Sequence, residues 1–429
     1  MKKITYVILM FVAVFAFSCS NRCNKECEKY KFLSNASIYE VNVRQFSEEG
    51  NFDAVTAQLE RLSELGVDVL WLMPISPIGV EGRKGTLGSY YSIVDYCEIN
   101  PEFGTKEDFK ELVDAAHKLG MKVMVDWVAN HTSRDSKWLK EGHLDWYVLD
   151  SAGNLGYLYD WTDVAELNYD NKDMRNAMAE ALKYWVKDFN IDGYRCDVAH
   201  EIPLEFWEYS IAELRKIKPE IIMLAESETP ELNANAFDMY YAWSVHARMN
   251  ELAQGKIDVN RFKNDLFVMY GRFPNNAVPM FFTSNHDENS WNGTEFERMG
   301  EAARTFAALS YCLKGMPLIY SAQEVGMNKR LEFFEKDPIN WEDEADFTDF
   351  YKSLNDMKSG NTAFCAFGKM IEVETNNADI FAFRRISNDT EALCFFNLTD
   401  TVQTFKYKMP NQKFSAAKNF AAWEYEINE

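Results

Sequence analysis

Short apolar runs and amphipathic stretches alternate eight times along the first three quarters of the chain. The apolar runs are rich in β-branched residues and begin at Ile38, Val67, Lys122, Gly193, Ile221, Phe237, Met280 and Pro317. Between them, apolar residues recur three and four apart, which predicts helices, most clearly over 52–65, 109–119, 174–189, 206–217 and 302–313. Such alternation predicts an α/β fold with a parallel sheet, and eight repeats favour a closed (β/α)8 TIM barrel over a doubly wound sheet.

Two segments fall outside this alternation. Residues 132–168, which follow the third predicted strand, are rich in Asp, Gly, Trp and Tyr and form an inserted excursion. After residue 360 the pattern changes to short alternating runs, which predict a small antiparallel β domain over 361–429. The sequence therefore predicts a barrel over 34–360, with one insertion, followed by a C-terminal β domain.

The amino-terminal end has the pattern of an export signal. In residues 1–18, two lysines precede an apolar stretch that is shorter than the roughly 20 residues needed to span a bilayer. Its end, Ala16-Phe17-Ser18-Cys19, resembles a bacterial lipoprotein cleavage site. We expect a lipid on Cys19, a polar tether over 19–33, and a location in the cell envelope, lipid-anchored at the periplasmic or outer surface of a bacterial membrane. The alternative is a plain signal peptide in which Cys19 has no role.

The composition is that of a globular protein with an acidic surface. The chain has 47% hydrophobic and 26% charged residues, which excludes intrinsic disorder. Its formal charge of −22 repels phosphate backbones, so nucleic acid is not an expected partner. The sequence contains no Cys-x-x-Cys pair and no His-Glu-x-x-His run, so zinc is not expected either.

Ionisable side chains collect where the predicted strands end, which is where α/β barrels carry their catalytic groups. These positions hold Asp126, Asn130-His131, Arg195, Asp197, Glu226 and Asn285-His286-Asp287. A single strand-end Asp more often caps a helix or a turn, but several carboxylates at one mouth are unfavourable unless the site uses them. Retaining cleavage of a glycosidic bond needs two carboxyl groups about 5 Å apart, and neighbouring strands, roughly 4.8 Å apart, would supply them.

Taken together, these segments resemble the α-amylase family, glycoside hydrolase family 13. The four signature regions correspond to Asp126–His131, Gly193–Asp197, Ala225-Glu226 and Asn285–Asp287, while Tyr91–Tyr96 and Glu166–Asn168 are similar to two auxiliary motifs. All occur in the order that the family has, and the resemblance covers nearly the whole chain after the tether. It implies a barrel, a short inserted domain B (132–168) and a truncated β-sandwich domain C.

The resemblance also implies a role for each motif residue. Asp197 would be the nucleophile that forms a β-glycosyl intermediate, and Arg195 would hold it ionised and oriented. Glu226 would act first as the general acid and then as the base that activates water. Asp287 would bind hydroxyls of the sugar at the cleaved bond and bind them more strongly in the transition state. The other implied sugar contacts are His131, His286, Asp95 and Tyr91, the second residue of a Tyr-Tyr pair.

Some positions depart from the family pattern. Many α-amylases carry Lys-His three and four residues after the nucleophile, whereas this chain has His200-Glu201, closer to the neopullulanase and cyclomaltodextrinase branch. Members of that branch usually carry a long amino-terminal domain, but here the first predicted strand begins at Ile38. The family's calcium site implies Asn130, with Asp163 and Asp170 as oxygen donors, and the short insertion leaves Ca²⁺ binding an open alternative.

The expected function is retaining hydrolysis of α-1,4-linked maltodextrin or starch fragments, with an α-glucan as partner and no organic cofactor. The alternatives within the family are an α-glucosidase, a neopullulanase-type enzyme or a glucan-transferring enzyme. A non-catalytic glycan-binding protein is a further alternative, although all three carboxylates Asp197, Glu226 and Asp287 are present. A phosphate-handling barrel lacks support because no Gly-rich phosphate loop occurs. The oligomeric state is left open.

Overall fold

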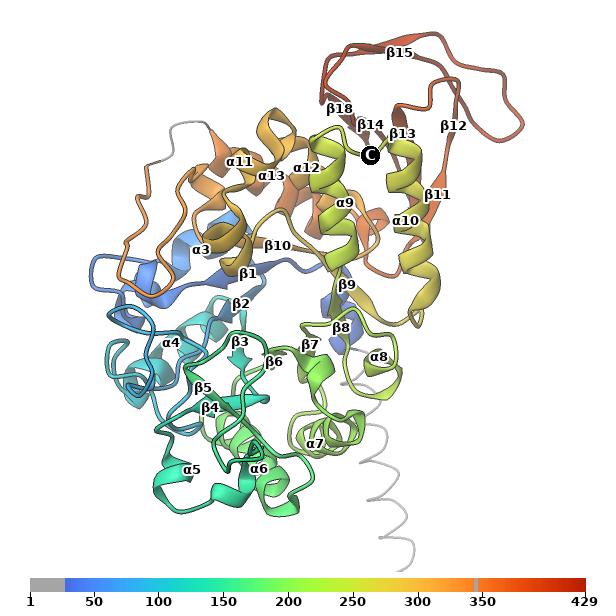
Figure 1. Cartoon of the computed structure of the whole chain (residues 1–429). Helices are drawn as coiled ribbons and strands as arrows, with labels where there is room; N and C mark the ends of the chain where they lie inside the picture. Colours follow the sequence, from blue (N-terminus) through green and yellow to red (C-terminus); the bar gives the residue numbers. More distant parts are fainter. Residues whose placement is uncertain (1–27, 343–345) are drawn as a thin grey trace, which may run out of the picture.

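Eight parallel strands close into a barrel in the computed structural model, which describes residues 28–342 and 346–429 (Figure 1). Their order around the barrel is β1 (Ile38–Val41), β10 (Met316–Tyr320), β9 (Val278–Phe281), β8 (Met239–Tyr241), β7 (Ile222–Ala225), β6 (Gly193–Cys196), β3 (Lys122–Trp127) and β2 (Val69–Leu72). Each strand contains or adjoins a run identified in the sequence. The (β/α)8 TIM barrel is therefore confirmed.

Amphipathic helices surround the barrel (Figure 1). They are α2 (Phe52–Thr56), α3 (Leu59–Leu65), α4 (Lys106–Lys118), α6 (Lys172–Asp188), α7 (Leu204–Ile217), α8 (Leu232–Asn235), α9 (Trp243–Ala253), α10 (Val259–Arg272), α11 (Glu295–Met299), α12 (Ala303–Cys312) and α13 (Phe347–Gly360). The prediction of a single helix over 52–65 was wrong, because α2 ends at Thr56 and a turn over 57–58 separates it from α3. The N–H of Ala57 donates to the carbonyl of Asp53, and that of Gln58 donates to Val55, before α3 begins.

Side chains fill the interior of the barrel. Trp71, Leu224, Tyr241 and Met280 project into it from four strands and are fully buried. Inward side chains of this kind are large and apolar, as in other closed barrels of eight strands. The interior is therefore a packed core, and barrels of this kind carry their sites at the carboxyl-terminal mouth.

The segment before β1 closes the opposite, amino-terminal mouth. Residues 28–35 are helical, Leu33 packs under the barrel core, and the ammonium of Lys29 lies 2.7 Å from the carboxylate of Asp238. Residues 28–33, expected as the end of a polar tether, therefore belong to the packed fold, because they supply an apolar plug and a buried ion pair. The predicted signal peptide and Cys19 lie outside the described residues. Within the described part of the chain, no helix has the length and apolar character needed to cross a membrane.

The insertion after β3 folds over the mouth of the barrel. Strands β4 (His131–Ser133) and β5 (Val164–Glu166) pair antiparallel and bring the two ends of the insertion together, with the short helix α5 (Lys137–Lys140) between them. The hydroxyl of Tyr147 lies within hydrogen-bond distance of Thr132 and Ser136 and fixes the connecting loop. This pairing places His131 at the edge of the mouth.

A small antiparallel β domain follows α13, as the sequence predicts. Its main sheet has the order β11 (Lys369–Glu372), β13 (Ile380–Ser387), β14 (Thr390–Asn397) and β18 (Tyr425–Asn428). Two ribbons pair β12 (Glu374–Thr375) with β16 (Tyr407–Lys408) and β15 (Gln403–Phe405) with β17 (Lys418–Phe420). Phe381, Phe383 and Phe396 of the sheet lie in the same buried cluster as Phe306 of α12. The sheet and the barrel thus share one apolar core.

Candidate active site

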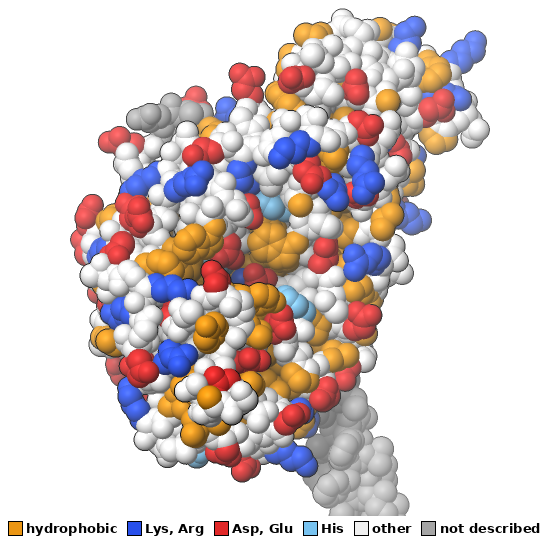
Figure 2. Space-filling view, in the orientation of Figure 1, with side chains coloured by type: hydrophobic (Ala, Val, Ile, Leu, Met, Phe, Trp, Pro, Cys, Tyr) orange, Lys and Arg blue, Asp and Glu red, His pale blue; other side chains and the backbone are white. Residues whose placement is uncertain are grey.

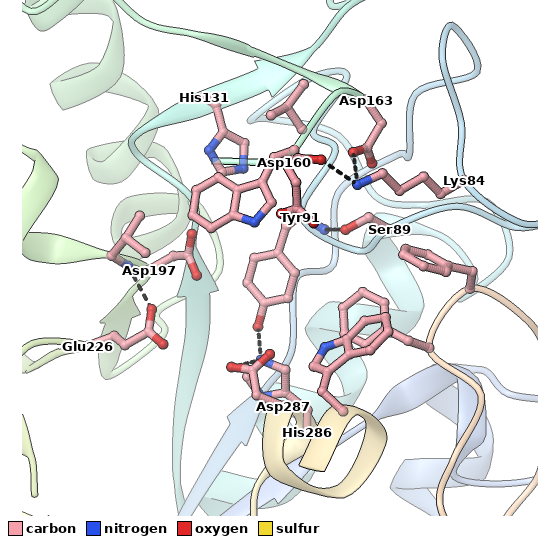
Figure 3. Close-up of a pocket in the computed structure, with 16 residues that line it drawn as sticks. Lys84, Ser89, Tyr91, His131, Asp160, Asp163, Asp197, Glu226, His286 and Asp287 are labelled. Atoms are coloured by element: carbon pink, nitrogen blue, oxygen red, sulfur yellow. Dashed lines mark hydrogen bonds and ion pairs between the residues drawn. The ribbon is translucent and has the colours of Figure 1, made fainter. Parts of the chain in front are cut away.

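A cavity of about 480 Å³ opens at the carboxyl-terminal mouth of the barrel. Tyr91, His131, Asp197, Glu226, His286 and Asp287 line it (Figure 3). They come from five different strand ends or loops, since Asp197 follows β6, Glu226 follows β7, and His286 and Asp287 follow β9. Figure 2 shows hydrophobic, acidic and histidine side chains gathered around the centre of this face. The structure thus brings together six of the residues that the sequence singled out.

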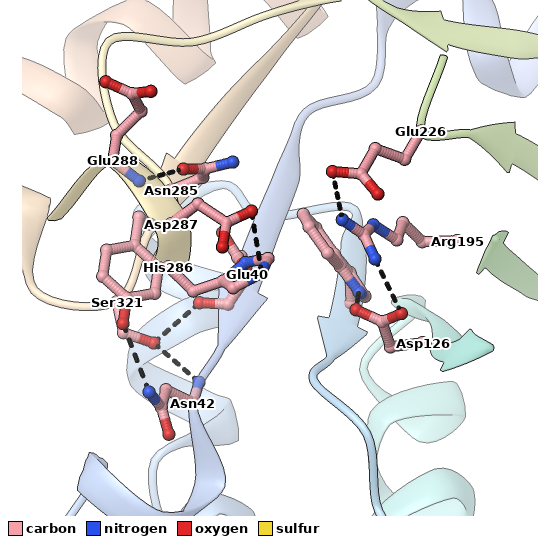
Figure 4. A network of polar contacts seen from close by, with 12 residues as sticks. Glu40, Asn42, Asp126, Arg195, Glu226, Asn285, His286, Asp287, Glu288 and Ser321 are labelled. Atoms are coloured by element: carbon pink, nitrogen blue, oxygen red, sulfur yellow. Dashed lines mark hydrogen bonds and ion pairs between the residues drawn. The ribbon is translucent and has the colours of Figure 1, made fainter. Parts of the chain in front are cut away.

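The buried guanidinium of Arg195 connects the carboxylates. Its Nη1 lies 3.0 Å from Oδ1 of Asp126, and its Nη2 lies 3.0 Å from Oε1 of Glu226 (Figure 4). The same Nη1 lies 2.8 Å from Oδ1 of Asp197. Burial opposes the charge of Arg195, but Asp126 and Glu226 raise its pKa well above the ordinary value. One permanent cation therefore contacts three acidic groups and fixes their positions.

Glu226 is the acid best suited to carry a proton. Burial raises its pKa most strongly, Arg195 opposes this, and Asp197 and Asp287 raise it further, to about 8. The backbone N–H of Val198 donates to Oε2 of Glu226 at 2.8 Å and orients the carboxyl group. A carboxyl group with this pKa is protonated at neutral pH and can donate a proton to a substrate oxygen.

Asp126 supports the site from beneath. Its Oδ2 accepts hydrogen bonds from the hydroxyl of Tyr91 at 3.0 Å and from Nε1 of Trp71 at 3.3 Å, while Oδ1 pairs with Arg195. Burial raises its pKa and Arg195 lowers it, with a net value of about 7. The sequence alone left Asp126 balanced between a helix cap and a site residue. Its contacts assign it to the positioning of Arg195 and Tyr91.

His286 lies beside a second buried acid, Glu40 in β1 (Figure 4), and it is linked to Asp126 through the hydroxyl of Tyr91. Its Nδ1 is hydrogen bonded to Glu40, and its Nε2 lies 2.7 Å from the hydroxyl of Tyr91 and 3.3 Å from Asp287. Burial lowers the pKa of His286, but Asp287 and Glu40 raise it to about 9. With both ring nitrogens protonated, His286 donates to Glu40 and Tyr91, which leaves the Tyr91 hydroxyl free to donate to Asp126.

The remaining sugar contacts predicted from the sequence fall into two groups. His131 lines the cavity beside Trp161, with ring centroids 5.4 Å apart. Tyr91 faces the cavity, whereas its neighbour Tyr90 is buried. Asp95 does not line the cavity: it accepts a hydrogen bond from the N–H of Cys97 at 2.9 Å and pairs with Lys137 at 3.0 Å.

Comparison with known proteins agrees with this geometry. The family model of the α-amylase catalytic domain matches residues 17–154 and 144–397. The chain belongs to the α-amylase family. It is therefore a glycoside hydrolase of the α-amylase type.

Two solved α-amylases and one curated relative illustrate the similarity. An α-amylase from Lactobacillus plantarum is 33% identical with a TM-score of 0.83, and the match covers 92% of this chain and 99% of that one. The maltogenic α-amylase AmyB from Thermotoga neapolitana is 28% identical with a TM-score of 0.82, over 91% and 95% of the two chains. The α-amylase MalA from Haloarcula japonica is 30% identical over 85% of this chain, which spans 56% of the length of MalA.

The three residues implied for the calcium site of an α-amylase have different surroundings. The side-chain amide of Asn130 donates to Nδ1 of His131 at 3.2 Å. Asp170, two residues after Asn168, is exposed. The carboxylate of Asp163 pairs with the ammonium of Lys84 at 3.3 Å. Over the described ranges, no group of three or more His, Cys, Asp or Glu residues is arranged to hold a metal ion. Binding of Ca²⁺ at Asn130, Asp163 and Asp170 stays a prediction.

The sequence motifs of α-amylases missed part of the cavity. Glu40 lies in the middle of an apolar strand, and its one signal is an acidic residue within the run Ile38–Val43. Lys84, Trp291, Phe333 and Phe334 also line the cavity but stand on loops that no motif covers. Loop residues of this kind are brought to a site by long-range contacts, which leave no local periodicity in the sequence.

Proposed function

We propose that the protein hydrolyses α-1,4-glucosidic bonds of maltodextrin- or starch-type α-glucans with retention of anomeric configuration. The observation that carries this proposal is the pair Asp197 and Glu226, bridged by the single guanidinium of Arg195. Carboxyl groups held on one guanidinium suit the separation of about 5 Å found in retaining enzymes better than the wider one of inverting enzymes.

In the first step, Glu226 would donate its proton to the glycosidic oxygen as the bond from that oxygen to C1 breaks. A carboxylate oxygen of Asp197 would attack C1 and form a β-glycosyl ester, while the shortened glucan leaves with the proton. In the second step, the Glu226 carboxylate would take a proton from water as the water oxygen attacks C1 and releases Asp197. A sugar hydroxyl in place of water would give transfer by the same route.

The other cavity residues would hold the sugar at the cleaved bond. Asp287 and His131 present hydrogen-bonding groups to the cavity, Tyr91 presents its ring, and His286 lines the cavity between Tyr91 and Asp287. As positive charge develops on the sugar ring, the acidic side chains around it become more favourable partners. We expect these contacts to affect kcat more than substrate binding.

Product analysis with purified protein and maltoheptaose tests the proposal. We expect short maltooligosaccharides that appear first as the α-anomer in proton NMR, and a loss of at least about 10³-fold in rate for Asp197→Asn. The matched control is Asp188→Asn, the same change at the exposed end of α6, which should leave the rate unchanged. A β-anomer formed first would overturn retention. No turnover of maltodextrin, pullulan or sucrose would overturn the assignment as a hydrolase of these glucans.

A further inference from the structure

Two loops at the mouth of the barrel are joined beside the cavity, where Lys84 and Phe334 line it. The loop after β2 donates to the loop after β10, from the N–H of Leu87 to the carbonyl of Phe334 at 3.0 Å and from the N–H of Thr86 to Oε1 of Glu335 at 2.7 Å. Gln45 holds the second loop from below, since its Nε2 donates to the carbonyl of Glu335 at 2.8 Å. These bonds tie the two loops to each other at the edge of the cavity, which Phe334 lines.

The same wall continues on both sides. On one side, Lys84 donates to the carbonyl of Asp160 at 3.0 Å and pairs with Asp163, which ties the loop after β2 to the insertion. On the other side, the N–H of Leu331 donates to Oδ1 of Asn289 at 2.8 Å, which ties the loop after β10 to the loop after β9. We call the four linked segments 84–88, 160–163, 288–292 and 329–335 the horseshoe wall.

The part of the horseshoe wall around Lys84 stands on the side of the cavity away from the catalytic pair. Figure 3 shows Lys84 on the opposite side of Tyr91 from Asp197 and Glu226. In a glucose ring, C1 and C4 lie across the ring from each other. A sugar with C1 between Asp197 and Glu226 therefore directs its O4, and any glucose linked there, toward the horseshoe wall.

Aromatic side chains cover the inner face of this wall. The ring centroid of Trp291 lies 5.1 Å from the ring centroid of Phe333 and 5.7 Å from that of Phe334. Trp291 is 52% exposed. The rings of Phe333 and Tyr91 are nearly parallel, with an angle of 11° between their planes and 6.4 Å between their centroids. Exposed aromatic faces beside a polar pocket suit the apolar face of a sugar ring. The wall thus offers a stacking surface for one glucose beyond the sugar at Tyr91.

We infer that the horseshoe wall ends the non-reducing side of the substrate site after two glucose units. The enzyme then removes maltose from the non-reducing ends of α-glucans and does not cut within chains. The cavity volume of about 480 Å³ fits this inference, because it lies in the range of pockets that enclose one small molecule. The inference rests on the proposed function and adds the chain end and the product length to it.

Two substrates test the inference. One is maltoheptaose, and the other is maltoheptaose whose non-reducing glucose carries a 4,6-O-benzylidene acetal, too bulky for a closed site. We expect α-maltose as the first product from the free substrate and a turnover at least about 100-fold slower for the capped one. Equal turnover of both would overturn the inference and leave the proposed function intact, whereas no turnover of either would overturn the proposed function itself.

Variants of the wall give a second measurement. Glu335→Ala removes the bonds to Thr86, and Phe334→Ala shortens the wall, so each should raise the turnover of capped relative to free substrate at least about tenfold. The matched control is Phe414→Ala, which removes a 43% exposed aromatic from the C-terminal domain and should leave the ratio unchanged. Because the ratio compares two substrates on the same protein, partial unfolding does not alter it. An unchanged ratio in both wall variants would overturn the role of the wall.

Discussion

Glu226 shows how neighbouring residues set the chemistry of a single carboxyl group. Burial and the two nearby carboxylates favour its neutral form, while Arg195 prevents the pKa from rising further. The outcome, a pKa of about 8, keeps the proton available at neutral pH and still allows the group to act as a base in the following step.

We expect kcat/KM for maltoheptaose to fall as the pH rises through about 8, because Glu226 then loses the proton that the leaving group needs. Glu226→Gln should lower kcat/KM by about 10²–10⁴-fold and remove this alkaline limb. With α-glucosyl fluoride, whose leaving group needs no proton, formation of the glycosyl ester should be much less affected. Initial rates of maltoheptaose hydrolysis against pH measure the first effect, and stopped-flow release of fluoride against pH measures the second. An alkaline limb that persists in Glu226→Gln would assign it to another group.

The positions of the proposed catalytic carboxylates at the mouth could be predicted from the sequence because each follows a strongly apolar strand and stands within a short motif. The role of Glu40, the acid that orients His286, could not be predicted. Glu40 is fully buried, and its role depends on a partner 246 positions away in the chain. Asp95 shows the opposite case, since its motif position is right for the family but its carboxylate is paired with Lys137 outside the cavity.

At the level of elements, charged side chains hold both ends of β6 in place. Arg195 and Asp197 lie at its carboxyl end, and Asp192 directly precedes its amino end. The carboxylate of Asp192 lies 2.6 Å from His117 and 2.8 Å from Lys218 and accepts the N–H of Val123 at 2.9 Å. The strand that carries the proposed nucleophile is thereby held against its neighbour β3.

We expect Asp192→Asn to lower the free energy of unfolding at pH 7 by about 3 kcal/mol, because it leaves a buried cation without its partner. Burial raises the pKa of Asp192, but His117 and Lys218 lower it well below the ordinary 3.8. The stability that Asp192 supplies is therefore complete above pH 3.8 and is lost as the pH falls toward the lowered pKa. Denaturant titrations between pH 7 and 3 measure it, with Asp188→Asn as control. Equal stability of Asp192→Asn and the unchanged protein at pH 7 would contradict this.

The strands of the barrel could be predicted because buried parallel strands form nearly continuous apolar runs. The paired strands of the insertion could not, since β4 is only His131–Ser133 and contains no apolar residue. The turn between α2 and α3 was missed for a related reason. The apolar positions keep their helical spacing across it, so the break at 57–58 leaves the pattern unchanged.

For the whole molecule, one buried arginine joins the barrel to the C-terminal sheet. Arg385 of β13 is fully buried and donates to the carbonyl of Cys312 at the end of α12, at 2.6 Å, and to that of Cys365 at 2.5 Å. Burial lowers its pKa, which shows the cost of placing this cation inside the junction. Arg385 thus supplies one charged hydrogen-bond donor to each of the two carbonyls.

We expect Arg385→Met to lower the free energy of unfolding by about 2–5 kcal/mol, because both carbonyls lose a charged donor within an apolar junction. The matched control is Arg384→Met, the adjacent residue, whose exposed partner Glu391 makes a surface pair worth at most about 1 kcal/mol. Thermal unfolding followed by circular dichroism measures both. Since neither side chain lines the cavity, kcat/KM of the folded protein should be the same for both variants. Similar midpoints for the two would contradict the role of Arg385.

The helical residues 28–35 also determine which end of the barrel would face a surface to which the chain is attached through its leading end. Their contacts with Asp238 and with the amino-terminal ends of the strands place the entry of the chain at the pole opposite the cavity. A surface to which the protein is attached through its leading end would therefore lie behind the barrel. The horseshoe wall and the catalytic pair would then point outward, where a polymer too large to approach that surface can still offer its chain ends.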